Sequence, residues 1–186
     1  MTTQQDPNML FDFQLKEETI VSIGCIEIML IPKHWLEGKT VRNVRGASFF
    51  HEYHHPVHHD VQITFYYRGF RINAEAGKAF CDVLASGNAA LTTDDLHKLK
   101  TAIGVIADPA EFSCQSAAIE ELNSRKVLVI EGKYLRSKTS ARIIFADVDT
   151  TGTVIQEIAY IAPENLYSEN YSQARDSLAS IIWIPN

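Results

Sequence analysis

The last third of the chain, residues 125–185, alternates between β-rich apolar runs and short polar turns. Two runs, 127–135 and 141–148, are separated by a five-residue polar turn, and a third, 154–161, follows the turn 149–152. Turns this short join neighbouring antiparallel strands, because a crossover to a parallel neighbour needs a dozen or more residues. The pattern therefore predicts a three-stranded antiparallel meander.

A helical period follows the meander. Its apolar positions recur at steps of four and three residues and would share one helical face: Tyr167, Tyr171, Ala174, Leu178 and Ile181. A face of this kind is stable when it is buried against another element. We therefore expect a closing helix that lies on the sheet.

The first half of the chain also favours strands. Residues 20–31 are rich in β-branched side chains and are interrupted at Gly24, which predicts a strand or a hairpin. Residues 40–50 and 61–70 predict two strands of a long hairpin around the loop 51–60. Residues 112–122 predict a return strand that leads into the meander.

Capping residues mark two helices between these strands. Asn73 is expected to cap a helix over residues 74–86, and Gly87 is expected to follow its last turn. Thr92 and Asp95 have the spacing of a capping box at the start of a second helix.

These elements predict an α+β fold, with a mostly antiparallel sheet of six to seven strands and about three helices packed on its faces. The chain has 186 residues, of which 46% are hydrophobic, enough for one sizeable core and short for two. No internal repeat or Gly/Pro/Ser-rich linker divides it. We expect a single domain over residues 1–186, with residues 1–9 as a flexible lead-in.

Several packing motifs resemble one fold group, that of the photosystem II subunit PsbP, DcrB and a Ran-binding nuclear import factor. The motifs are the turn Ile31-Pro32-Lys33-His34-Trp35, the strand segments 133–135, 143–145 and 158–163, and the tail 178–183. The resemblance implies an α/β/α sandwich and a non-enzymatic adaptor, chaperone or assembly role. The type VI secretion chaperones that resemble DcrB bind apolar segments of client proteins.

Charge and composition narrow the class of partner and the compartment. The formal net charge is −6, and acidic residues interrupt the arginines nearest to a basic group, so nucleic acid is not an expected partner. Three widely spaced cysteines favour reduced thiols. The longest apolar run, residues 26–32, is too short to span a bilayer, and residues 1–18 lack the features of a secretory signal. We expect a cytoplasmic protein without membrane insertion.

A histidine cluster is the main candidate for chemistry. Five of the seven histidines fall within nine residues, and with one nearby carboxylate they form a candidate site for zinc, nickel or copper: His51, His54, His55, His58, His59 and Asp60. Pro56 argues against a continuous helix, whereas a hairpin would bring His55 to His58 or His59. The alternatives are a solvated loop at a hairpin tip and a surface that responds to pH.

Aromatic residues of the run 61–70 are the second candidate site. Phe65, Tyr67 and Phe70 could contact a protein, although aromatic side chains in strands more commonly pack in a core. No nucleophile elbow or Cys–His signature occurs, and no cofactor is expected. We therefore expect a non-enzymatic binding, chaperone or assembly protein that acts through a protein–protein surface. The alternative is a metal-binding protein that uses the loop 51–60.

Overall fold

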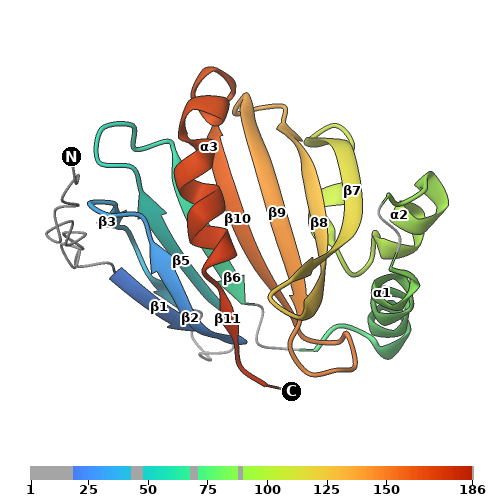
Figure 1. Cartoon of the computed structure of the whole chain (residues 1–186). Coiled ribbons are helices and arrows are strands. Elements are labelled where there is room, and N and C mark those ends of the chain that lie inside the picture. Colours follow the sequence, from blue (N-terminus) through green and yellow to red (C-terminus); the bar gives the residue numbers. More distant parts are fainter. Residues whose placement is uncertain (1–18, 43–47, 68–70, 88–89, 186) are drawn as a thin grey trace, which may run out of the picture.

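The structure, a computed structural model, describes residues 19–42, 48–67, 71–87 and 90–185. In this part of the chain, two antiparallel sheets and three α-helices form an α+β sandwich (Figure 1). The smaller sheet has the order β1-β2-β11, with β1 (Thr19–Ile23), β2 (Ile26–Ile31) and β11 (Ile182–Trp183). The predicted fold class is confirmed.

The larger sheet has the order β3-β5-β6-β10-β9-β8-β7, and β4 pairs with β5. Its strands are β3 (Leu36–Glu37), β4 (Val41–Arg42), β5 (Phe49–His54), β6 (Gln62–Tyr67), β7 (Phe112–Leu122), β8 (Arg125–Tyr134), β9 (Thr139–Asp147) and β10 (Ile155–Pro163). The helices are α1 (Ala74–Ser86), α2 (Thr93–Leu99) and α3 (Glu164–Ala179), with the 3-10 helix η1 (Gly104–Ile106) after α2. β8, β9 and β10 are the predicted meander.

Opposite faces of the larger sheet carry separate cores, because successive side chains of a strand point to opposite sides. On β9, Ile144 and Ala146 face the core under α3 and the smaller sheet, whereas Ile143 and Phe145 face the core under α1 and α2. Figure 1 shows α3 crossing one face, with α1 and α2 at the other end of the sheet. We call the face under α3 the first face and the other the second face.

Local signals fix the helix ends as predicted. Asn73 Oδ1 accepts a hydrogen bond from the Ala76 amide at 2.7 Å, and Gly87 follows the last turn of α1 with φ of 64°. Thr92 and Asp95 form the capping box of α2. These features depend on residues three positions apart in sequence, which is why the pattern could show them.

Three features differ from the expectations. β5 runs through His54, so the loop expected at 51–60 loses its first four residues to a strand. The strand expected over residues 40–50 is β4 followed by the start of β5, with residues 43–47 outside the described part. The separate sheet β1-β2-β11 was also not expected, since it joins strands about 150 residues apart in sequence.

A buried glutamine fastens the two sheets together. Gln156 of β10 is fully buried, and its Oε1 accepts a hydrogen bond from the Cys25 amide at 2.7 Å. Its Nε2 donates to the Ile23 carbonyl at 3.0 Å. Both backbone groups belong to the β1–β2 turn, where Gly24 has φ of 60° and a Cβ would lie 2.2 Å from Gln156 Oε1. The turn and the glutamine therefore fit only as a pair, which we call the glutamine clasp.

Replacement of Gln156 by leucine is expected to lower the free energy of unfolding. It would leave the Cys25 N–H and the Ile23 C=O buried without partners, at a cost of about 1–3 kcal/mol for each group. Urea denaturation followed by tryptophan fluorescence measures the loss. The exposed Gln173, which accepts one bond from Trp35 at 3.3 Å, gives the matched control Gln173→Leu. Equal stability of the two variants would contradict the role of the clasp.

Candidate functional site

The histidine cluster lies at the tip of the β5–β6 hairpin. The connection is closed by two backbone hydrogen bonds, His55 N–H to the Val61 carbonyl and Val61 N–H to the His58 carbonyl, both 2.8 Å. His51 and His54 belong to β5, and the other three histidines belong to the turn. The hairpin geometry that was expected for this segment is confirmed.

Two histidines meet across the turn. The rings of His55 and His58 are stacked, with centroids 5.3 Å apart and an angle of 20° between their planes. His55 Nδ1 accepts hydrogen bonds from the amides of Val57 (3.2 Å) and His58 (3.1 Å), so the neutral ring carries its proton on Nε2. Burial, and next the nearby His58, lower the pKa of His55. A metal ion on either nitrogen would have to displace this arrangement.

His54 lies on the second face and has a different environment. Its Nδ1 lies 2.7 Å from the His59 carbonyl oxygen, so Nδ1 carries a proton and donates it. Its Nε2 lies 3.1 Å from Glu52 Oε1. A backbone carbonyl behind one ring nitrogen is the arrangement that orients the other nitrogen toward a metal ion. His54 and Glu52 are therefore the two groups of the hairpin that are best placed to bind a cation.

His51 is buried and points to the first face. Its Nδ1 lies 2.6 Å from Thr40 Oγ1, and its Nε2 lies 3.4 Å from Glu37 Oε1, so the ring holds both ends of the segment between β3 and β4. Burial lowers the pKa of His51, and the carboxylates of Glu37 and Glu52 act in the opposite direction. The His51 ring thus links the segment 37–40, at the edge of the larger sheet, to β5.

The six predicted metal ligands are thus distributed among separate environments. His51 is inside, His54 is on the second face, His55 and His58 stack beside Trp35, and His59 and Asp60 are exposed at the turn. Among the described residues, no group of three or more His, Cys, Asp or Glu side chains is arranged to hold a metal ion. The structure brings together pairs, of which His54 and Glu52 are one.

The predicted aromatic contact residues also separate. Phe65 is fully buried in the core of the first face, and its ring is T-shaped to the Tyr53 ring, with centroids 6.2 Å apart. The prediction of Phe65 as a contact residue is therefore wrong, because its side chain points into this covered core and has no exposed surface. Tyr67 is half-buried, and Phe70 lies outside the described residues.

An aliphatic surface that the sequence reasoning missed lies on the smaller sheet. Its four residues, here called the outer patch, are Ile20, Ile28, Leu30 and Ile182. Ile20 pairs with Leu30 and Ile28 with Ile182 across neighbouring strands, so the patch is continuous over β1, β2 and β11. Ile20 is 63% exposed and Ile182 is 50% exposed. The inner residues of these strands, such as Met29, are buried in the core instead.

The borders of the outer patch differ on its two sides. On the side of β11, Ser180 Oγ accepts a hydrogen bond from the Leu30 amide at 2.8 Å, and the Ser177 hydroxyl donates to the Leu30 carbonyl. α3 therefore closes the edge of β2. On the other side, no strand of the described chain pairs with the second edge of β1, whose residues include neither a charge nor a proline. Such an edge can accept another strand.

None of the described helices is both long and apolar enough to cross a membrane.

The burial of His51 predicts a dependence of stability on pH. Because its pKa in the folded protein is below the ordinary 6.5, its contribution is fully present above pH 6.5 and is lost as the pH falls below that value. For one group the slope cannot exceed about 1.4 kcal/mol per pH unit. We expect His51→Phe to lose less unfolding free energy than the wild type between pH 6.5 and 5, as measured by urea denaturation. The variant His97→Gln, at an exposed position of α2, should keep the wild-type slope; a wild-type slope in His51→Phe would contradict the assignment.

Comparisons with known proteins bear on the fold. No known protein family and no curated protein matches the sequence. Among solved structures, the chain is similar to the cyanobacterial PsbP protein (CyanoP) of Synechocystis sp. PCC 6803, with a TM-score of 0.54 and 13% identity over 88% of this chain and 95% of that one. A Pseudomonas aeruginosa protein of unknown function has a TM-score of 0.49 and 9% identity over 91% of this chain and 99% of that one. The similarity to CyanoP shows that the chain has a PsbP-like fold.

Proposed function

We propose that this protein is a non-enzymatic binding or assembly protein and that the outer patch is its contact surface for a protein partner. The observation that carries the proposal is the continuous set of aliphatic side chains on the exposed side of the smaller sheet. Contiguous apolar surface on a folded protein is characteristic of interaction sites, whereas single exposed apolar residues are ordinary.

The outer patch is also held rigidly. Its three strands are fixed by the glutamine clasp at the β1–β2 turn and by the serines of α3 at Leu30. A preorganised surface loses little conformational entropy when it binds, so more of the contact energy remains for affinity. The outer patch is thus preorganised for contact with a partner.

The charge around the outer patch indicates the chemistry of the partner. Glu27 is exposed on β2 next to the patch, and the chain has a formal net charge of −6. A partner that surrounds an aliphatic centre with lysine or arginine would match both features, because complementary charge speeds association. We therefore propose a partner with a basic rim and an apolar centre.

The cysteines support the non-enzymatic part of the proposal. Burial, the largest cause in each case, raises the pKa of Cys25 and of Cys81 to about 11. A thiolate is the nucleophilic form, so a thiol with this pKa is rarely reactive near neutral pH. Cys81 instead donates a weak hydrogen bond to Asp147 Oδ2 at 3.6 Å.

The test is a charge-introducing double variant, Ile20→Lys with Ile182→Lys. A partner is first isolated with the wild-type protein from cells of the source organism, and binding is then measured with purified components by calorimetry. We expect the double variant to weaken binding by about tenfold or more, since two desolvated aliphatic contacts are lost. Melting temperatures should be nearly unchanged, because both positions are exposed.

Val57 provides the matched control. It is 71% exposed at the hairpin tip, away from the outer patch, and Val57→Lys introduces the same kind of change. Equal affinity of the double variant and the wild type would refute the proposal. An equal loss in Val57→Lys would show a general effect of charge instead.

A second candidate function is binding of a divalent metal ion at the histidine hairpin. The observation that favours it is the pair His54 and Glu52, with the His54 ring oriented by the His59 carbonyl. We expect zinc, nickel or copper to raise the melting temperature of EDTA-treated protein, because a ligand of the folded state stabilises it by mass action. The rise should disappear in His54→Ala and persist in His97→Ala. No rise in the wild type would exclude this function.

A further inference from the structure

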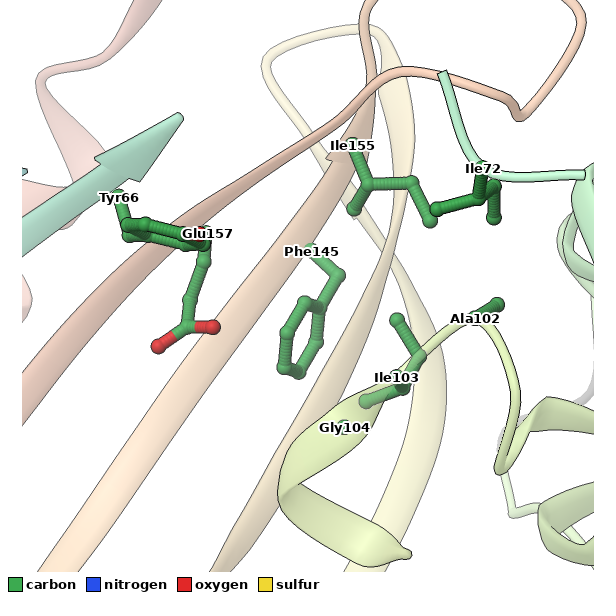
Figure 2. Close-up of a pocket in the computed structure, with 8 residues that line it drawn as sticks. All are labelled: Tyr66, Ile72, Ala102, Ile103, Gly104, Phe145, Ile155 and Glu157. Carbon is green, nitrogen blue, oxygen red and sulfur yellow. The ribbon is translucent and has the colours of Figure 1, made fainter. Parts of the chain in front are cut away.

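Two hollows of different size lie on the second face of the larger sheet. The smaller, of about 50 Å³, lies between the sheet and the segment that joins α2 to η1 (Figure 2). Most of its lining residues are apolar: Tyr66, Ile72, Ala102, Ile103, Gly104, Phe145, Ile155 and Glu157. A space of this size holds a few water molecules, because one water needs about 10–15 Å³. The smaller hollow is therefore too small for a whole organic ligand.

The larger hollow has a volume of about 410 Å³ and lies where the β5–β6 hairpin and the β8–β9 turn meet the ends of β8, β9 and β10. Sites for small molecules commonly have about 300–1,000 Å³, so a ligand of that class has room here. We call it the polar hollow, and its lining residues are Asp60, Gln62, Tyr134, Ser137, Thr139, Ile161 and Pro163.

Strand register builds the floor of the polar hollow. Tyr134 of β8 lies directly opposite Thr139 of β9, and Thr139 lies opposite Pro163 of β10. In a neighbouring row, Ile161 of β10 lies opposite Gln62 of β6. Directly opposed residues point to the same face of a sheet. An aromatic ring, a proline ring and an aliphatic side chain therefore share one surface with a hydroxyl and an amide.

The Tyr134 ring is held in place by the core of the second face. It is T-shaped to the ring of Phe112, with centroids 5.0 Å apart, and Phe112 is buried. Burial is the largest cause that raises the pKa of Tyr134, so its hydroxyl keeps a proton to donate. A side chain fixed in this way loses little conformational entropy when a ligand binds.

Several polar groups of the polar hollow have hydrogen-bonding capacity left for a ligand. Within the described chain, the side chains of Asp60, Gln62 and Tyr134 make no hydrogen bond. Every buried side-chain nitrogen or oxygen of the described residues has a partner, so the polar atoms of these three side chains reach solvent. The hydroxyls of Ser137 and Thr139 lie 2.7 Å apart, and one of them keeps its proton for another acceptor.

We propose that the polar hollow binds a neutral sugar ring. The hydroxyl groups of a sugar both donate and accept hydrogen bonds. They would match the accepting carboxylate of Asp60, the amide of Gln62 and the hydroxyl of Tyr134. The C–H groups on one face of the sugar would contact the Tyr134 ring, whose face carries partial negative charge, together with Ile161.

Other classes of small ligand fit the lining less well. An anion would meet the carboxylate of Asp60, and none of the lining residues is a cation. An apolar ligand would leave the Gln62 amide and the Tyr134 hydroxyl covered without partners, which is unfavourable. A cation would gain only the exposed Asp60, and exposed ion pairs contribute little.

The same ring chemistry occurs in a free monosaccharide and in the terminal unit of a longer glycan. Asp60 and Ser137 are exposed at the rim of the polar hollow, so further sugar units could extend past them. The polar hollow belongs to the larger sheet, whereas the outer patch belongs to the smaller one. The proposal therefore does not depend on the proposed protein partner.

The first experiment titrates the protein with the methyl glycosides of glucose, galactose and mannose and follows the amide resonances of Gln62, Tyr134 and Thr139. We expect saturable shifts with at least one glycoside. We expect none with tetrahydropyran-2-methanol, which has the ring but lacks the ring hydroxyls. The uronic acid form of the best-binding glycoside should bind more weakly, because its carboxylate meets Asp60. Absence of saturable shifts with all three glycosides would overturn the proposal.

Two variants test the assigned contacts with the best-binding glycoside. Asp60→Ala should weaken binding by about tenfold or more, since hydrogen bonds to a charged group are lost. Asp82→Ala removes the same group from an exposed position of α1 and should bind like the wild type. Tyr134→Phe keeps the packing against Phe112 and should weaken binding by about threefold, since one neutral hydrogen bond is lost. Unchanged affinity in both Asp60→Ala and Tyr134→Phe would overturn the proposal.

A further arm identifies the source of the sugar ring. The best-binding methyl glycoside is compared with the disaccharide formed by two units of the same sugar. Tighter binding of the disaccharide would indicate the terminal unit of a glycan, and weaker binding a free monosaccharide. In both cases Asp60→Ala should reduce the affinity; disaccharide binding that does not respond to Asp60→Ala would contradict the assigned site.

Discussion

The glutamine clasp is the interaction on which the arrangement of the two sheets depends. A sheet of three short strands has little stability of its own, because it buries only one face. Here that face is buried against the larger sheet, and the amide of Gln156 satisfies the two backbone groups of the β1–β2 turn that this burial removes from water. A hydrocarbon side chain in its place would fill the space and leave the turn without partners. The clasp therefore allows the Cys25 end of the turn to be buried and fixes where the smaller sheet lies.

The outer patch is a consequence of this layering. The smaller sheet lies outside the larger one, so its inner residues complete a core and its outer residues have no described layer above them. In an ordinary two-layer domain such positions would be polar. Four aliphatic residues at these positions thus reduce solubility without adding to the core. Contact with another molecule would give them a role.

Local features of this fold could be predicted from the sequence and non-local ones could not. The caps of α1 and α2 and the meander depend on neighbours in the chain, and the structure has them where the pattern places them. β11 consists of two residues that pair with Ile28 and Ile26, more than 150 positions earlier, and two residues show no period. Residues 20–31 are apolar at nearly every position, so no alternation showed which of them face outward.

The histidine hairpin could also be predicted only in part from the sequence. Count and spacing suggested a single metal site, but strand alternation sends His51 and His54 to opposite faces of β5. Only the meeting of His55 with His58 was open to prediction, because a turn over Pro56 and Val57 brings these two residues together. The buried Phe65 is similar. The hairpin with β5 was predicted, but its aromatic neighbours in sequence gave no sign that β10 pairs with the other edge of β6 or that this face is covered.

Two adjacent residues of β10 point to opposite faces of the larger sheet. Gln156 points to the first face and holds the smaller sheet, whereas Glu157 points to the second face, between Tyr66 and Phe145. A slip of β10 by one residue would exchange them, placing a carboxylate between the sheets opposite the Ile23 carbonyl. Burying that charge beside a carbonyl oxygen would cost far more free energy than the slipped pairing could return. Register is therefore fixed at this point, and with it the position of the outer patch.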